Sequence, residues 1–362
     1  MWSATFLLIT FALLLLPLLP SLRELKFATD VQPLKVIQAY DTEITHFADG
    51  FRVWLRKNFG HFFDEQGAFT GPVSQGTLAD KTRFQIVGTH SAPSFSEKEI
   101  ASATTHTLII SNAALRLEKA LFYESEVYSA ADIETAAHSQ FRALLAEGNM
   151  MLAQDCTVLR WVHSAMSLHA ADGCSLFGRA SAAHEMTLGK GSQFERLHAS
   201  KIIFGAAVAP IAPATGTLIA LTELPHIKDR YGRHWLIDGD IDVPAHHAFD
   251  GDLVATKNIH IGAGTHIMGS LKSTGDMYLA AGSQIDGAVV SRGNIHMGHG
   301  CRIAGPVIAE DTILIEEQSV IGLAAQPTTV TAPRIRIASG VTAYGTVWAD
   351  ENALVLPIGV AA

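Results

Sequence analysis

Glycine recurs at a fixed interval of eighteen residues in the second half of this sequence. One series consists of Gly251, Gly269, Gly287 and Gly305. The residues between them form pairs separated by one residue, and successive pairs begin six residues apart, as in Leu253/Ala255, Ile259/Ile261 and Thr265/Ile267. Alternate residues of a β-strand point to the same side, whereas an α-helix repeats every 3.6 residues. Three short strands per period predict a three-sided parallel β-helix, an all-β solenoid whose coils stack about 4.8 Å apart.

A diverged form of the same repeat fills residues 106–204. The segment Gly173-Cys174-Ser175-Leu176-Phe177-Gly178 has the form of Gly300-Cys301-Arg302-Ile303-Ala304-Gly305. We expect a one-residue deletion near Leu144 and a last inward pair at His198/Ser200. An insertion with three prolines should follow at residues 205–234, and the regular β-helix should occupy residues 235–362, with a smaller insertion at Ala324 to Pro333.

The cysteines and the net charge limit the metal, disulfide and nucleic-acid functions that the chain can have. Cys156, Cys174 and Cys301 share the repeat position that Ser283 fills, which favours small buried residues. The alternatives are a metal site, or a disulfide between Cys156 and Cys174 on adjacent coils. The net charge of -9 and the lack of a basic stripe argue against a nucleic-acid partner.

The N-terminus predicts a membrane anchor. Residues 2–20 are uncharged and leucine-rich, which is about the length of a bilayer span. Arg23, Lys26 and Lys35 follow this run, and no basic residue precedes it. The positive-inside rule then predicts a transmembrane anchor at residues 1–22, in a single-pass inner-membrane protein with a cytoplasmic body. A cleaved signal peptide with a periplasmic body is the alternative.

Residues 23–105 are expected to form a juxtamembrane or capping region. Ile44, Phe47, Phe51, Leu55 and Phe59 lie at helical spacing, so an amphipathic helix is predicted near residues 37–59. Such a helix would lie along the membrane or cap the β-helix, since solenoids need covered ends. Residues 82–87 are expected to form a strand.

The sequence offers little chemistry, although it contains 17 histidines. His260 and His296 flank inward residues and should point outward on one side, while His266 and His299 lie at corners. No recurring carboxylate beside them is evident in the sequence, so a solvated face is favoured over a metal site. Motifs for nucleotide binding and nucleophilic catalysis are absent from the sequence. We therefore predict no catalytic, cofactor-binding or metal-binding residues, and no cofactor.

The unit apolar-x-Gly-x-apolar recurs between residues 235 and 349. It appears as Ile267-Met268-Gly269-Ser270-Leu271, Ile285-Asp286-Gly287-Ala288-Val289 and Ile303-Ala304-Gly305-Pro306-Val307. Together with Asp238-Gly239-Asp240 and Asp250-Gly251-Asp252, these units make the segment resemble the bactofilins, the polymer-forming cytoskeletal proteins of bacteria. The resemblance implies a β-helix that assembles end to end at the membrane without nucleotide. Bactofilins are usually shorter and have a single repeat domain, so polymerisation is in doubt here.

Two enzyme classes are alternatives to a scaffold. Hexapeptide-repeat acyltransferases share the eighteen-residue coil, and Ile261-Gly262, Met297-Gly298 and Ile321-Gly322 fit their hexad. His260, His266 or His299 would then be the base at a subunit interface. A polysaccharide-acting β-helix enzyme would need a carboxylate pair on one face, and none is evident.

The end of the last coil is the predicted site of self-association. Unpaired strand edges and apolar groups are expected near Val347, Leu354 and Leu356, and an uncovered edge is a template for another chain. The expected partners are copies of this chain, the membrane through residues 1–22, and cell-envelope or polysaccharide machinery.

Overall fold

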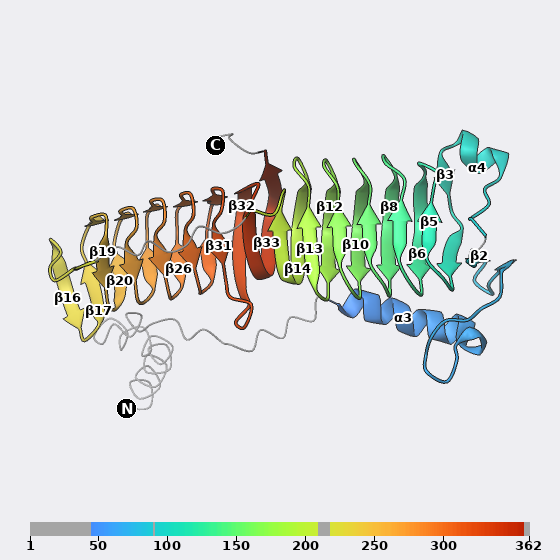
Figure 1. The fold of residues 1–362 in the computed structure, drawn as a ribbon, viewed down its shortest axis with the longest axis horizontal. Helices are drawn as coiled ribbons and strands as arrows, with labels where there is room; N and C mark the ends of the chain where they lie inside the picture. The colour runs from blue at the N-terminus through green and yellow to red at the C-terminus, as the bar shows by residue number, and fades with distance from the viewer. Residues whose placement is uncertain (1–44, 90, 209–217, 358–362) are drawn as a thin grey trace, which may run out of the picture.

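The chain forms a long rod of stacked coils (Figure 1). The structure is a computed structural model that describes residues 45–89, 91–208 and 218–357. Each coil contributes short strands to three sides of a parallel β-helix, which confirms the predicted solenoid. The rod consists of two β-helices, which we call the first half (residues 83–204) and the second half (residues 219–356).

Two α-helices, one 3-10 helix and one strand lie outside the coils, within residues 46–101. These elements are α3 (His46–Phe59), η3 (Gly60–Phe62), β1 (Ser74–Thr77) and α4 (Glu97–Ala101). Side 1 of the first half is built by β2 (Arg83–Val87), β4 (Leu108–Ser111) and the ends of β6 (Phe122–Ser129), β8 (Gln140–Ala146), β10 (Thr157–Ser164) and β12 (Ser175–Ala182), followed by β14 (Gln193–Phe204). Side 2 contains β5 (Leu115–Leu117), β7 (Ile133–Thr135), β9 (Met150–Leu152), β11 (Leu168–Ala170) and β13 (Glu185–Leu188). Side 3 is formed by β3 (Thr104–Thr105) and the beginnings of the long strands.

The second half begins with β15 (Ile219–Ala220) and β16 (Ile227–Tyr231). Its side 1 contains β17 (His234–Ile237), β20 (Asp252–Ala255), β23 (Leu271–Ser273), β26 (Val289–Ser291) and β29 (Val307–Ala309). Side 2 contains β18 (Ile241–Val243), β21 (Ile259–Ile261), β24 (Met277–Leu279), β27 (Ile295–Met297) and β30 (Thr312–Ile315). Side 3 contains β19 (His247–Phe249), β22 (His266–Ile267), β25 (Gln284–Ile285), β28 (Arg302–Ile303) and β31 (Val320–Ile321). The long strands β32 (Thr328–Ala338) and β33 (Val341–Leu356) turn corners and form the last coils.

The register of the second half is the one that the sequence predicts. Met277 pairs with Ile295, and Ile295 pairs with Ile313, each in the parallel strand of the next coil. Cys301 and Ser319 occupy the small-residue position and are fully buried. One continuous core runs through both halves from Val87 to Val355, so the coil interior is filled by side chains.

The glycine series is explained by close stacking of the corners. A Cβ atom on Gly269 would lie 2.1 Å from the carbonyl oxygen of Gly251. A Cβ atom on Gly305 would lie 2.5 Å from the carbonyl oxygen of Gly287. Backbone approach at this distance leaves no room for any side chain, which accounts for the glycines at this corner in the four coils from Gly251 to Gly305.

The diverged half departs from the predicted register in one place. Val127 pairs with Leu144, seventeen residues later, which confirms the deletion. A second deletion was not predicted: Ala180 pairs with Leu197, so Leu197 and Ala199 point inward. The expectation of an inward His198/Ser200 pair is therefore wrong.

The second insertion is shorter than predicted. Strand β32 begins at Thr328, and Val330 and Ala332 are buried in the core. Val330 pairs with Val307 of the preceding coil. The interruption therefore ends before Thr328, and residues 328–333 belong to the β-helix.

The two halves run in opposite directions along the rod. In Figure 1 the coils of the first half progress from β2 at one end to β14 in the middle, and those of the second half progress from β17 at the other end to β33 in the middle. Strands β14 and β33 then pair antiparallel. Phe204 therefore lies near the middle of the rod and Ile219 near its far end, and each half contributes its last coil to a central joint.

Helix α3 lies along side 1 of the first half (Figure 1). Its buried face is formed by Ala48, Phe51, Leu55 and Phe59. This face packs on outward-pointing residues of the strands, including Ile110, Tyr128 and Leu145, and forms a second apolar cluster outside the coil. Arg52 fixes the helix by two hydrogen bonds of 2.8 Å to the Glu147 carboxylate.

The predicted localisation requires correction. No helix within residues 45–89, 91–208 and 218–357 is long and apolar enough to cross a membrane, and the predicted span at residues 1–22 lies outside these ranges. A single-pass inner-membrane protein is therefore not supported. The described part of the predicted amphipathic helix lies on the β-helix, where it covers side 1.

Candidate functional site

The central joint is the place where two β-helix ends meet. Leu197 of β14 lies opposite Val347 of β33, and both side chains are 0% exposed. Hydrogen bonds continue beyond side 1: the Gly191 amide donates to the Val355 carbonyl at 2.8 Å, and the Val355 amide donates to the Ser192 carbonyl at 2.9 Å. The backbone edge of each last coil is thereby satisfied by the other half.

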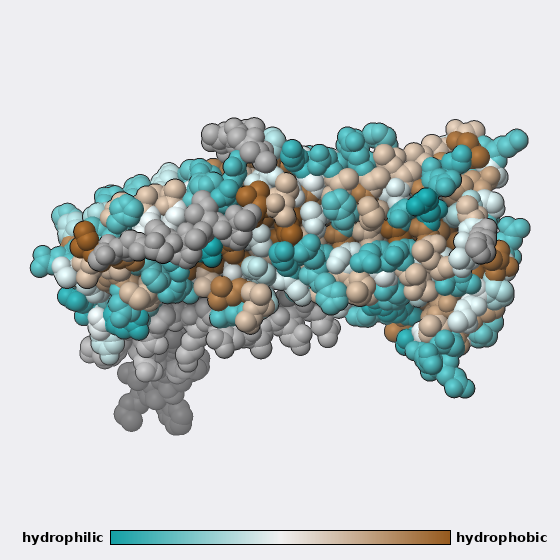
Figure 2. Space-filling view, in the orientation of Figure 1, coloured by the Kyte–Doolittle hydropathy of each residue, from teal (hydrophilic) through white to brown (hydrophobic). Residues whose placement is uncertain are grey.

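Outward side chains also cross the joint. The Arg196 guanidinium lies over the Trp348 ring, 4.0 Å from its centroid. The imidazole Nδ1 of His198 lies 3.0 Å from the Thr346 hydroxyl oxygen, and burial lowers the pKa of His198. Figure 2 shows apolar residues gathered near the middle of the rod. The joint therefore combines strand pairing with a stacked cation and a neutral hydrogen bond.

The predicted self-association residues lie in this joint. Val347 faces Leu197, Leu354 pairs with Gln193, and Leu356 is buried. They do not form the uncovered edge that the sequence suggested, because β14 covers it. Self-association through these three residues stays a prediction, but its premise of an open C-terminal edge is wrong.

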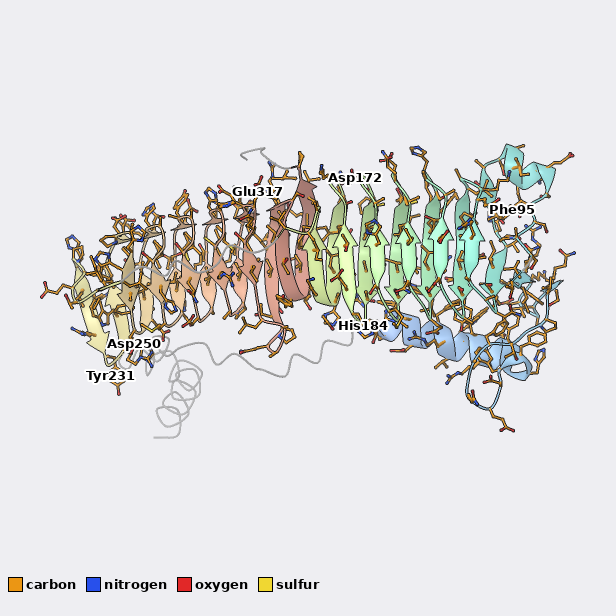
Figure 3. All side chains as sticks on the ribbon, viewed as in Figure 1. Phe95, Asp172, His184, Tyr231, Asp250 and Glu317 are labelled. Carbon is orange, nitrogen blue, oxygen red and sulfur yellow. The ribbon has the colours of Figure 1, made fainter. Side chains whose placement is uncertain are left out.

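Antiparallel hairpins occupy the two outer ends of the rod. Strand β1 pairs with β2 at the first end, and β16 pairs with β17 at the second. All five residues of β16 are exposed, and Tyr231 is 78% exposed at the tip (Figure 3). Lys228, Asp229 and Arg230 place charges along this outermost strand. Charged, short edge strands discourage pairing with another chain.

The four candidate histidines do not converge on one site. His260 and His296 lie on the same outer face and flank Tyr278, whose ring stacks on His260 at 5.0 Å. His266 lies within strand β22 on side 3, so its expected place at a corner is wrong, whereas His299 does lie at a corner. The structure therefore shows no common catalytic centre for these residues.

Carboxylates accompany three of these histidines, contrary to the expectation from sequence. His260 lies 3.2 Å from Asp242, His266 lies 3.0 Å from Asp286, and His296 lies 2.8 Å from Glu316. The partners are in adjacent coils, so sequence proximity does not reveal them. Each pair is exposed and isolated, as expected for a solvated face.

The three cysteines are buried and free, as the packing interpretation predicts. Burial raises the pKa of Cys174 and of Cys301 to about 12, which keeps both thiols protonated and unreactive. Within the described ranges, no group of three or more His, Cys, Asp or Glu residues is placed to hold a metal ion.

Sequence reasoning missed the residues of β14, although a signal was present. The first half ends on the apolar run Ile202-Ile203-Phe204 and the second on Leu354-Val355-Leu356. An apolar run in the last coil of a solenoid requires a cover, so each run indicated a partner. A comparison of this chain with protein-family models, with curated proteins and with solved structures finds no match.

Proposed function

We propose that this chain is a non-enzymatic scaffold of the bactofilin type, in which the end-to-end contact between two β-helices is made within one molecule. The observation that carries this proposal is the antiparallel β14–β33 joint. It buries the edges through which separate chains would otherwise associate.

Two further features support a scaffold over an enzyme. The interior of both halves is filled by a continuous core of buried side chains, as expected of a structural solenoid. The candidate histidines are spread over different sides and pair singly with carboxylates. A catalytic base needs a positioned reacting group beside it.

The outer ends favour a discrete rod over a filament. Each end is covered by a hairpin whose edge strand is polar or charged. With seven side-1 strands in each half, β2 to β14 and β17 to β33, the rod should measure roughly 65 Å at about 4.8 Å per coil. Negative-stain microscopy of the purified chain should show single rods of this length. Long filaments without added nucleotide would contradict the capped rod.

Two like charges introduced at the joint test the role of the β14–β33 pairing directly. Glutamates at both His198 and Thr346 would face each other across the joint, so H198E/T346E should destabilise it by about 1–3 kcal/mol. The opened edges should then pair between molecules, and analytical ultracentrifugation should detect larger species. The matched control is H198K/T346E, in which opposite charges face each other and the monomer should persist. Identical sedimentation of both variants would refute the role of the joint.

A further inference from the structure

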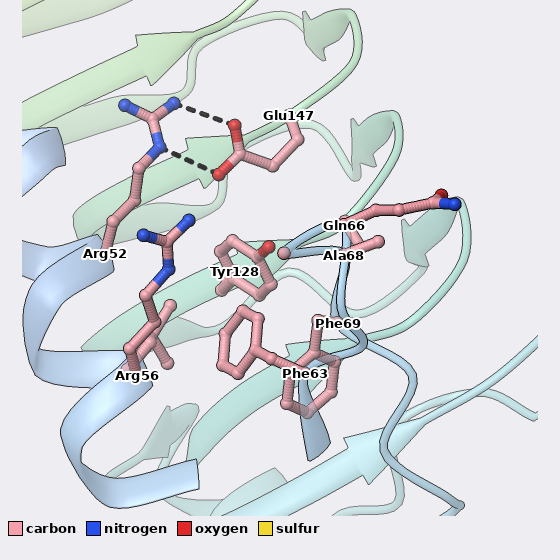
Figure 4. Close-up of a pocket in the computed structure, with 11 residues that line it drawn as sticks. Arg52, Arg56, Phe63, Gln66, Ala68, Phe69, Tyr128 and Glu147 are labelled. Carbon is pink, nitrogen blue, oxygen red and sulfur yellow. Dashed lines mark hydrogen bonds and ion pairs between the residues drawn. The ribbon is translucent and has the colours of Figure 1, made fainter. Parts of the chain in front are cut away.

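A hollow of about 340 Å³ lies between α3 and side 1 of the first half, outside the coil (Figure 4). Its wall on the helix side contains Arg52 and Arg56, and its base on β6 contains Tyr128. The loop after η3 closes it with Phe63 and Phe69. This volume is at the low end for a small-molecule pocket. The hollow is remote from the joint and plays no part in the proposed scaffold function.

The two arginines in the hollow have different partners. Both nitrogens of the Arg52 guanidinium that face Glu147 donate to its carboxylate, and Arg52 also contacts Asp49 at 2.8 Å. Arg56 lies one helical turn later and has no carboxylate partner among the residues that the structure describes. Its guanidinium lies 6.0 Å from the centre of the Phe63 ring. Arg56 is thus the cation in the hollow whose charge is not already matched.

Tyr128 supplies a second unused polar group. Its side chain is 4% exposed, and its hydroxyl makes no hydrogen bond to any residue in the described ranges. Although the residue as a whole is buried, its hydroxyl is not enclosed: it opens onto the hollow, where a ligand or water can hydrogen-bond to it. Figure 4 shows the arginines extending from α3 toward the space in front of Tyr128. The Tyr128 hydroxyl and the Arg56 guanidinium therefore line the same hollow.

Hydrogen bonds within the loop shape one wall of the hollow. The Asp64 carboxylate accepts hydrogen bonds from the amides of Gln66 and Ala68, at 3.0 and 2.8 Å, and so fixes the loop. Gly67 has a φ of +82°, and a Cβ atom there would lie 3.3 Å from the Arg56 guanidinium. Glycine permits this conformation and leaves the guanidinium room. A preformed site loses little entropy on binding.

The lining selects the chemistry of the ligand. Phe63 and Phe69 pack edge to face at 5.2 Å, and Phe69 contacts Tyr128 at 6.1 Å, so a flat apolar body finds an aromatic wall. One unmatched guanidinium matches one carboxylate, to which it can donate two parallel hydrogen bonds. The Glu147 carboxylate nearby disfavours a second negative charge on the ligand.

We propose that this hollow is a binding site for a small aromatic monocarboxylate, held by Arg56 and the Tyr128 hydroxyl and stacked against Phe63 and Phe69. Such a ligand would bridge α3, the loop that follows η3 and strand β6. Its occupancy would therefore fasten the helix to the β-helix.

Calorimetric titration of the intact chain with benzoate, phenylacetate and 3-phenylpropionate tests the proposal. At least one acid should bind with a Kd of about 1 mM or tighter. R56Q should weaken that binding by at least about tenfold, because a charge-assisted hydrogen bond is lost. Y128F keeps the ring packing and should weaken it by about threefold to tenfold. Absence of binding by all three acids at 10 mM, on the order of ten times that Kd, would overturn the proposal.

Controls separate anion recognition from other causes. Lys57 is the exposed residue next to Arg56 and does not line the hollow, so K57Q should bind as the unaltered chain does. The amide of the best acid should bind at least about tenfold more weakly, because it lacks the charge. Equal binding of the amide would reduce the site to an apolar hollow. Equal binding of inorganic phosphate would show that the aromatic wall plays no part, and either result contradicts the proposal.

Discussion

The two halves of the rod have the same kind of coil but treat the outer face of side 1 differently. In the first half, outward residues such as Ile110, Tyr128 and Leu145 are buried beneath α3. In the second half, the corresponding outward positions hold Val254, Lys272, Val290 and Ile308, which are half-buried, and no helix in the described ranges covers them. The inward pattern fixes the coil, while the outer face is free to acquire a second core.

Hydrogen-bonded ladders run along corners of both halves and extend over more coils in the second half. In the second half, Asn258 donates two hydrogen bonds of 3.0 Å to Asp240, and the Asp276 amide donates to Asn258 at 2.8 Å. Asn294 continues the series on Asp276. Alternating Asp with Asn keeps like charges two coils apart. A shorter ladder is present in the first half, where Asn149 donates to Asp132 and the Ser167 amide donates to Asn149, so the packed helix is the feature that distinguishes the first half.

The largest expected effect comes from charging the inner ladder of the second half. Ile295 is 1% exposed, so Ile295→Asp should lower the free energy of unfolding by about 4 kcal/mol, as an unpaired buried charge does. Urea unfolding measures this loss, and hydrogen exchange should locate it in the second half and at β14. His296→Ala, at the next residue on the outer face, should change stability by less than about 1 kcal/mol. Similar effects of the two substitutions would refute the register.

A smaller effect is expected from the helix–solenoid interface of the first half. Leu55 lies on the buried face of α3 and is fully buried. Leu55→Ala should lower the free energy of unfolding by about 2–4 kcal/mol through lost burial and a residual cavity. The control is Val53→Ala on the exposed face of the same helix, which should be nearly neutral. Hydrogen exchange should place the loss in α3 and the strands beneath it. A loss that extends equally into the second half would remove the distinction between the two.

The smallest effect concerns pH and again separates the halves. Burial lowers the pKa of His163 to about 4, with Arg52 acting in the same direction and Glu147 and Asp49 opposing it. Protonation therefore favours the unfolded chain: stability is complete above about pH 6.5 and is lost as the pH falls toward 4. The Tm of the first half should therefore fall between pH 7 and pH 5. In His163→Gln the dependence of Tm on pH should be smaller. Equal slopes in the two proteins would show that His163 is not the group responsible.

The sequence predicts the coil because inward residues are repeated at a spacing that one physical pattern explains. Met277, Ile295 and Ile313 could be assigned to one ladder without any structure. One-residue deletions are harder to locate. An unbroken eighteen-residue spacing predicts the inward pair His198/Ser200, but the deletion before Leu197 makes Leu197 and Ala199 the inward residues. In a diverged repeat, small and polar residues satisfy two registers almost equally well.

The central joint could not be predicted from the sequence, for a different reason. A repeat specifies which residues point inward, but it does not specify where the next block of coils begins. The place of the second block is defined by the antiparallel pairing of β14 with β33, which no repeat spacing encodes. The pairing of His296 with Glu316 is similar, since the two residues are adjacent only because successive coils stack. Contacts made between repeats require the three-dimensional arrangement.

The joint also sets the order in which this protein can be completed during synthesis. Strand β14 ends at Phe204, but its partner is finished only when the ribosome has added Leu356, which is 356 − 204 = 152 residues later. At about 5–20 residues per second, this interval lasts roughly 8–30 s. The first half can fold in that time, yet its last edge waits unpaired. Nascent chains on one messenger would then present identical open edges to one another, and the second half must arrive before a neighbour does.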